Sequence, residues 1–172
     1  LSIVDNGRWS DIFDVTVCAD DVEQYKPAPD VLCQAIARTS EKTDGSVWYV
    51  GDSQTDMTTA LNAGVTRVFY NGAHWEERWI DRIIANKIEN PEAPQLVVDS
   101  FEELMDALQS LQVCQKSQGH SVFLSNLKEI RPKAFPPRDP PPKRIEADWH
   151  PAVVKLTQPK TIIFDWHATL VD

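Results

Sequence analysis

Apolar runs that end in a carboxylate constrain the fold of this 172-residue chain more than any other feature. The run 161–164 (TIIF) is followed by Asp165, and the run 47–50 (VWYV) is followed by Gly51 and Asp52. Short apolar runs of this kind are typical of buried strands. A carboxylate just past such a strand stands at the carboxyl edge of a sheet, where open α/β proteins bind their ligands. The two segments are far apart in the sequence but are expected to contribute to one site.

A lysine and a further carboxylate complete the pattern. Lys26 opens the segment KPAPD after another strand-like run, residues 13–18 (FDVTVC), and Asp56 follows Asp52 within the segment GDSQTD. A nucleophilic carboxylate, one lysine and an acidic pair are the groups that metal-assisted phosphoryl transfer through an aspartyl-phosphate requires. The sequence therefore predicts this chemistry.

These segments resemble the motifs of the haloacid dehalogenase (HAD) superfamily of phosphohydrolases. The first motif of that family is hydrophobic-Asp-x-Asp-x-Thr-Leu, the third is a lysine often written Lys-Pro-x-Pro, and the fourth is Gly-Asp-x-x-x-Asp. Here they read FDWHATL, KPAP and GDSQTD. The resemblance covers residues 1 to about 108 and about 160 to 172, and is closest to the phosphoglycolate-phosphatase-like branch. It implies an α/β fold with a doubly wound parallel sheet, the Rossmann-like HAD core.

The resemblance also implies a role for each residue. Asp165 would attack phosphorus, and Lys26 would neutralise Asp165 and bind the substrate phosphate. Mg²⁺, a hard cation that prefers oxygen ligands, would be held by Asp165, Asp52 and the backbone carbonyl at position 167. Asp56 would bind the metal through water or orient Lys26.

His167 departs from the family pattern, which has an aspartate there as general acid and base. Histidine can carry protons near neutral pH, since its unperturbed pKa is about 6.5, and a metal contact through the backbone carbonyl of His167 would survive the exchange. Thr169 would shape the same loop and form a hydrogen bond near the nucleophile. Catalytic roles are therefore expected for His167 and Thr169 besides Asp165 and Lys26. The alternative is that His167 only packs beside Trp166.

The order of the motifs differs from the family, in which the nucleophile comes first. Three accounts stay open: a permuted or partial representation of one HAD domain, a cut across two tandem copies, or a true circular permutant. The first is favoured because one set of motifs makes one site. We expect residues 1–111 to form the core part with the lysine and acidic motifs, 112–159 a proline-rich basic arm or linker, and 160–172 the nucleophile strand and loop. A cap domain is expected to be absent from this chain.

Periodicity predicts the remaining elements. Apolar spacing indicates helices, and short β-branched or aromatic runs indicate strands. Ser100 and Glu103 have the spacing of a capping box at the start of the last helix. Strands that alternate with helices imply a parallel, doubly wound sheet. The predicted helices are 29–38, 58–63, 75–86 and 101–111, and the further strands are 66–70 and 96–98. Within the arm, the run 121–126 (SVFLSN) resembles the family's second motif but is out of order.

Composition narrows the class of function. The net charge of −9 argues against nucleic acid and anionic membranes as partners, and no apolar stretch approaches the roughly 20 residues of a membrane span. Three cysteines without a Cys-x-x-Cys pair fit a reducing compartment. Composition therefore favours a cytoplasmic protein, and the resemblance implies a hydrolase that acts on a small phosphorylated metabolite. A protein partner of the proline-rich arm is a secondary expectation.

Two alternatives to a Mg²⁺-dependent phosphohydrolase stay open. The chain would be a weakly active or inactive HAD-fold binding module that acts through its basic arm, or a HAD hydrolase of carbon–halogen or carbon–phosphorus bonds. The exchange at His167 motivates the second alternative. Dehalogenases of the family need no metal, so a dependence on metal separates these enzymes. The sequence leaves the substrate open, because the cap that selects it is expected to be absent.

Overall fold

The computed structural model describes residues 12–39, 41–73, 91–116, 156–167 and 169–170 of the chain, with side chains up to residue 112 in the third of these ranges. In this part, four parallel strands form one sheet in the order β3-β2-β1-β4. The strands are β1 (Val47–Gly51), β2 (Thr66–Tyr70), β3 (Leu96–Val98) and β4 (Thr161–Phe164). The helices are α2 (Asp30–Thr39), α3 (Gln54–Ala63) and α5 (Phe101–Lys116), with 3-10 turns η2 (Ala19–Asp21) and η3 (Asn71–Ala73). The predicted α/β fold with a parallel sheet is confirmed.

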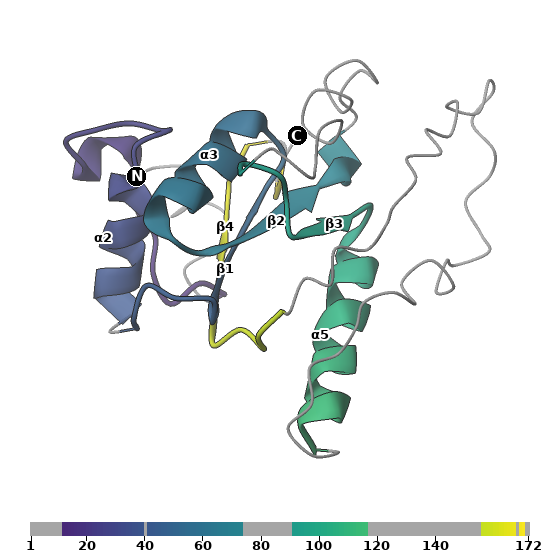
Figure 1. Cartoon of the computed structure of the whole chain (residues 1–172). Coiled ribbons are helices and arrows are strands. Elements are labelled where there is room, and N and C mark those ends of the chain that lie inside the picture. Colours follow the sequence, from purple (N-terminus) through teal and green to yellow (C-terminus); the bar gives the residue numbers. More distant parts are fainter. Residues whose placement is uncertain (1–11, 40, 74–90, 117–155, 168, 171–172) are drawn as a thin grey trace, which may run out of the picture.

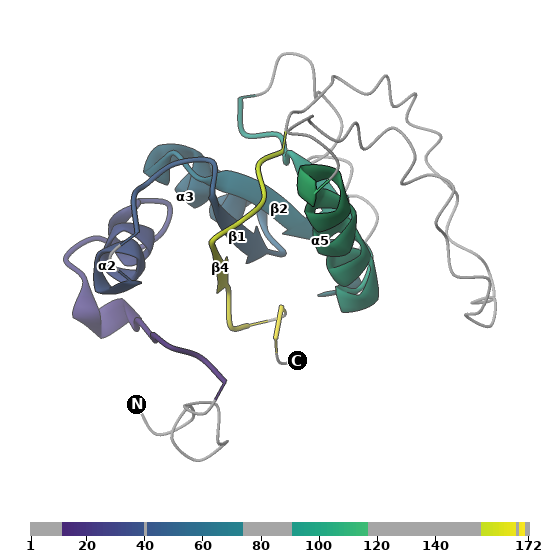
Figure 2. The same cartoon turned by 90° about the horizontal axis from the view of Figure 1, so that it is seen from below.

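Helices cover both faces of the sheet, with α2 and α3 on one side and α5 on the other (Figure 1, Figure 2). Along β1, Val47 and Tyr49 belong to the core cluster beneath α2 and α3, whereas Trp48 and Val50 belong to the cluster beneath α5. Side chains of a strand alternate between the two faces, so a strand covered on both sides is apolar throughout. This accounts for the uninterrupted run VWYV and for the complete burial of β1.

Strand β4 lies beside β1, although the two strands are separated by most of the chain (Figure 2). The backbone N–H of Asp165 donates to the carbonyl of Val50 at 2.8 Å and extends the ladder past the last residue of β4. At the other end of the ladder, the N–H of Lys160 donates to the carbonyl of Ser46 at 2.8 Å. The carboxyl ends of β1 and β4 therefore meet at one edge of the sheet.

Helix α3 begins earlier than the predicted range 58–63, which is wrong at its start. Ser53 is the N-cap: its hydroxyl oxygen accepts the N–H of Asp56 at 3.2 Å, and the Asp56 carboxylate accepts the N–H of Ser53 at 3.1 Å. This reciprocal pair is a capping box, which satisfies two backbone donors that the helix leaves without partners. Gly64 ends the helix in the left-handed region, with φ of 70°. As a result, Asp56 lies in the first turn of a helix.

Helix α5 begins at the predicted residue and runs beyond the predicted end at 111. The hydroxyl oxygen of Ser100 accepts the N–H of Glu103 at 3.2 Å, as a capping box requires. The Glu103 carboxylate, however, accepts the N–H of Asp99 at 2.8 Å, one residue before the expected position. Helix α2 differs from the predicted 29–38 by one residue at each end.

The strand predicted over residues 13–18 is wrong, because this segment does not pair with any strand of the described sheet. Instead, the guanidinium of Arg38 in α2 donates to the carbonyl of Thr16 at 2.7 Å. Phe13 packs edge to face on Phe164, with ring centroids 6.4 Å apart. Alternating apolar residues favour an extended backbone, but a strand also needs a neighbouring ladder. Side-chain contacts take the place of that ladder here.

Some predictions lie outside the described residues: the helix 75–86, the run 121–126 and most of the arm 112–159. The domain boundaries therefore stay a prediction. At the described end of the arm, Leu156 is buried and belongs to the core cluster beneath α5. None of the helices in the described part of the chain combines the length and apolar character that a membrane span requires.

Trp48→Phe should lower the free energy of unfolding. The Trp48 side chain is fully buried, and its indole N–H donates to the carbonyl of Thr157 at 3.1 Å, which ties the segment before β4 to β1. The phenyl ring leaves part of the space empty and the carbonyl without its donor, so we expect a loss of about 1–2 kcal/mol in urea-induced unfolding.

Met105→Gln is the matched control, because Met105 lies on α5 and is 52% exposed. Its effect should stay within about 0.5 kcal/mol. Equal losses for the two variants would show that the indole contact contributes nothing specific.

Candidate active site

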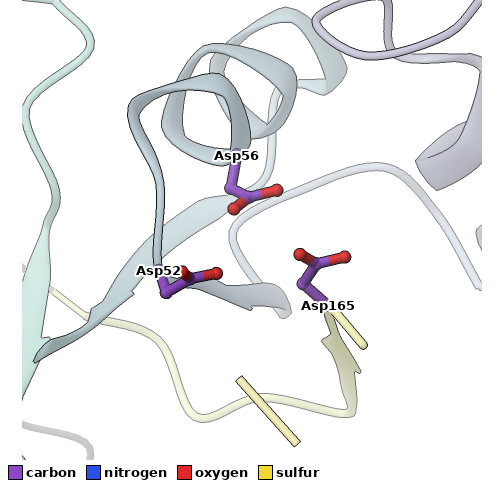
Figure 3. Close-up of side chains that lie close together, drawn as sticks. All are labelled: Asp52, Asp56 and Asp165. Atoms are coloured by element: carbon purple, nitrogen blue, oxygen red, sulfur yellow. The ribbon is translucent and has the colours of Figure 1, made fainter. Parts of the chain in front are cut away.

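Three carboxylates meet at the edge of the sheet where β1 and β4 end (Figure 3). Asp52 directly follows β1, Asp165 directly follows β4, and Asp56 comes from the first turn of α3. One carboxylate oxygen from each residue lies within 4.8 Å of one from each of the others. Asp52 and Asp56 are buried, whereas the side chain of Asp165 is 23% exposed. The chain thus gathers buried negative charge around one carboxylate that solvent reaches.

Lys26 lies between two of these carboxylates. Its ammonium nitrogen is 2.8 Å from Oδ1 of Asp56 and 2.7 Å from Oδ1 of Asp165. Burial by itself lowers the pKa of Lys26, but the charge of Asp56 and the hydrogen bonds to Asp165 and Asp56 outweigh burial, so the pKa stands above the ordinary value. Lys26 therefore keeps its positive charge at neutral pH.

Asp56 accepts hydrogen bonds on both carboxylate oxygens. Oδ1 accepts from Lys26 and, at 2.9 Å, from the hydroxyl of Tyr49, while Oδ2 accepts the N–H of Ser53 at 3.1 Å and its hydroxyl at 2.5 Å. Burial and the nearby charges of Asp56 and Asp165 raise the pKa of Tyr49 well above its usual range, so the phenol keeps its proton and remains a donor. With four donors around it, Asp56 fixes the positions of Lys26, Tyr49 and Ser53.

The loop that carries Lys26 is hydrogen-bonded to α3. The side-chain amide of Asn62 donates to the backbone carbonyl of Pro27 at 2.9 Å. A turn closes around the lysine, because the N–H of Ala28 donates to the carbonyl of Tyr25 at 3.0 Å. Helix α3 therefore holds both the ammonium group of Lys26, through Asp56, and the backbone of the next residue, Pro27, through Asn62.

Thr169 and His167 lie in the loop after β4. Thr169 is buried, and its hydroxyl donates to Oδ1 of Asp52 at 3.2 Å, next to the carboxylate of Asp165. His167 is exposed, and its imidazole is not part of the carboxylate cluster in the described structure. The role of His167 in proton transfer stays a prediction.

The donor set fits a hard divalent cation. Three carboxylates face the single ammonium of Lys26, so the formal charges of these four side chains sum to −2. Buried charges are unfavourable unless they are compensated, and carboxylate oxygens are the ligands that Mg²⁺ prefers. Asp52, Asp56 and Asp165 together could therefore hold such an ion.

Sequence reasoning missed three residues that hold the site: Tyr49, Ser53 and Asn62. Ser53 carried a signal, because Ser-x-x-Asp before a helix has the spacing of a capping box. Tyr49 carried a weaker one, since a phenol within a buried strand needs a hydrogen-bond partner. Asn62 carried none, because its contact to Pro27 depends on how the loop lies over α3.

Residues 2–70 match the sequence model of a family described as haloacid dehalogenase-like hydrolase. The matched range contains Lys26, Asp52 and Asp56, and ends well before Asp165. The chain has no match among curated proteins or among solved structures. Asp165 is therefore connected to the matched region through the pairing of β4 with β1 and through its ion pair with Lys26.

Gly51→Ala should disturb this site. A Cβ atom at Gly51 would lie 2.5 Å from Cβ of Asp56 and 2.6 Å from its Cγ, too close for either group to stay in place. Asp56 cannot withdraw without losing its contacts to Tyr49 and Lys26. We expect a loss of about 1–3 kcal/mol in the free energy of unfolding, measured in urea.

Gly45→Ala provides the matched control. A Cβ atom at Gly45 would meet only the hydroxyl oxygens of Thr157 and Thr66, at 3.8 and 3.9 Å, which are ordinary contact distances. Its unfolding midpoint should stay close to that of the parent protein. A Gly51→Ala variant as stable as Gly45→Ala would contradict the close packing of Asp56 against β1.

Proposed function

We propose that this chain carries the site of a Mg²⁺-dependent phosphohydrolase that cleaves a small phosphorylated metabolite through an aspartyl-phosphate on Asp165. The observation that carries the proposal is the ammonium of Lys26, which contacts Asp165 and Asp56 beside the buried Asp52. The match of residues 2–70 to a hydrolase family supports it. The phosphoglycolate-phosphatase-like branch is the nearest source of substrates to test.

Asp165 suits the role of nucleophile. Its carboxylate is partly exposed, whereas Asp52 and Asp56 are buried and held by neighbouring side chains. One oxygen of Asp165 would attack phosphorus while the bond from phosphorus to the leaving oxygen breaks. Lys26 would offset the negative charges of Asp165 and of the incoming phosphate, which otherwise repel each other. The ion pair at 2.7 Å holds Asp165 ready for this approach.

The metal would be held by Asp52, Asp165 and the backbone carbonyl of His167. When bound, Mg²⁺ supplies positive charge that stabilises the phosphoryl oxygens as negative charge develops on them. Thr169 would keep Asp52 in place through its hydrogen bond at 3.2 Å. Asp56 would serve mainly to orient Lys26, because both of its carboxylate oxygens accept hydrogen bonds from protein donors.

His167 would move the proton in both halves of the reaction. It would first donate a proton to the leaving oxygen, so that an alcohol departs. It would then accept a proton from the water that attacks the phosphorus of the aspartyl-phosphate, which releases inorganic phosphate and frees Asp165. Its exposed position, two residues beyond Asp165, is compatible with reaching a bound substrate.

The alternatives receive less support from the described residues. A metal-free hydrolase of carbon–halogen bonds would leave the excess negative charge around Lys26 without compensation. A binding module would not need a lysine held against a solvent-accessible carboxylate. Most of the proline-rich arm, on which a protein partner would depend, lies outside the described residues.

Asp165→Asn should abolish phosphate release, because the amide cannot act as the nucleophile. The parent chain should release phosphate from small phosphate monoesters with Mg²⁺ present and lose that activity when the metal is removed with a chelator. The measurement is a phosphate-release screen, and the melting temperature of Asp165→Asn confirms that the variant is folded.

Asp52→Asn tests metal binding independently of phosphate release. Mg²⁺ should raise the melting temperature of the parent, since a ligand that binds only the folded state stabilises it, and should raise that of Asp52→Asn much less. Metal-independent phosphate release from the parent, or equal turnover in Asp165→Asn, would refute the proposed function.

His167→Ala should lower turnover by about 10²–10⁴-fold, the usual contribution of a general acid–base group. His167→Asp should keep or raise turnover, because a carboxylic acid can carry the same proton. Turnover is measured with a substrate whose leaving group is a poor one, since an activated phenolate ester departs without protonation. If His167→Ala and the parent turn over equally, His167 takes no part in the mechanism.

A further inference from the structure

We propose that Tyr49, a residue of β1 that never touches substrate, is a positioning residue that keeps Lys26 aimed at Asp165. This inference rests on the proposed function, in which Lys26 neutralises the nucleophile and the phosphate. It assigns a role to a side chain that the family's motifs leave out, since the fourth motif begins at Gly51.

Tyr49 contacts both members of the ion pair that orients Lys26. Its hydroxyl donates to Oδ1 of Asp56 at 2.9 Å, and the same oxygen accepts the ammonium of Lys26 at 2.8 Å. Its ring lies beneath the ammonium, 5.4 Å from nitrogen to ring centroid, within the range of a cation–π contact. Tyr49 is 2% exposed and lies on a central strand, so its own side chain is held in place by the core.

Tyr49 and Lys26 share Oδ1 of Asp56, and this sharing determines how strongly Asp56 attracts the ammonium of Lys26. While the phenol donates to Oδ1, part of the negative charge on that oxygen is already satisfied. The ammonium can then also contact Asp165, which lies at 2.7 Å. Without the phenol, Oδ1 of Asp56 would attract Lys26 more strongly. The ammonium would move toward the buried carboxylate and away from the nucleophile.

Tyr49→Phe tests the hydroxyl alone, because the phenyl ring keeps the packing and the cation–π contact. In the full chain with Mg²⁺, kcat should fall on the order of tenfold while KM changes by less than about threefold, since a small misplacement of a catalytic charge acts mainly on the chemical step. A purely structural role would lower the unfolding midpoint and leave both constants of the folded enzyme unchanged.

Tyr70→Phe is the matched control. It removes the same atom from the neighbouring strand β2, where the Tyr70 ring stacks on Phe101 of α5 with centroids 4.8 Å apart, on the other face of the sheet from Tyr49. Its kcat and KM should equal those of the parent. An equal fall in kcat for Tyr49→Phe and Tyr70→Phe would overturn the inference.

A double-mutant cycle in urea unfolding gives a readout that does not need activity. In the described structure, Oδ1 of Asp56 accepts from Lys26 and from Tyr49, so in a Lys26→Met background the phenol of Tyr49 is its remaining donor. Tyr49→Phe should therefore lower the unfolding midpoint more in the Lys26→Met background than in the parent. Tyr70→Phe should shift the midpoint equally in both backgrounds. Additive effects of Tyr49→Phe and Lys26→Met would overturn the inference.

The two proposals fail separately. A parent chain that releases no phosphate, together with a non-additive cycle, would refute the proposed function and support the coupling of Tyr49 to Lys26. An active parent whose kcat is unchanged by Tyr49→Phe would refute the positioning role and leave the proposed function standing.

Discussion

The parallel ladder between β1 and β4 is the contact on which the site depends. It brings Asp165, near one end of the sequence, to the same sheet edge as Asp52, and the backbone bond from Asp165 to Val50 continues the ladder to the site itself. In a parallel sheet the carboxyl ends of neighbouring strands lie at one edge. Two carboxylates that each follow a strand therefore come together as soon as those strands pair, whatever their separation in the chain.

Once these carboxylates are close, their negative charges repel one another and have to be compensated. Lys26 compensates part of this negative charge, and several groups position its ammonium. Asp56 contacts the ammonium nitrogen, Tyr49 donates to the same oxygen of Asp56, and Asn62 binds the loop that carries Lys26. Lysine is a flexible point charge, so its position is set by what surrounds it. The negative charge that Lys26 leaves uncompensated makes the three carboxylates a candidate site for a divalent cation.

Much of this arrangement could be predicted from local patterns. The runs before Asp52 and Asp165 form strands, and both residues lie with Lys26 at one sheet edge. The errors arose where local patterns are ambiguous. Residues 13–18 alternate like a strand, yet their carbonyl at Thr16 bonds to Arg38 and no ladder forms in the described sheet. The start of α3 was missed because an acidic segment reads as a loop unless its capping box is recognised.

The sequence by itself determined the parallel α/β fold and the chemical groups of the site, because strand periodicity and residue type are properties of short segments. Only the tertiary structure decided which groups share a hydrogen bond. Three features depend on how distant segments pack. Thr169 donates to Asp52, Tyr49 and Lys26 share one oxygen of Asp56, and β4 pairs with β1. Such contacts leave no periodic trace in the chain, since each joins residues whose spacing in the sequence is arbitrary.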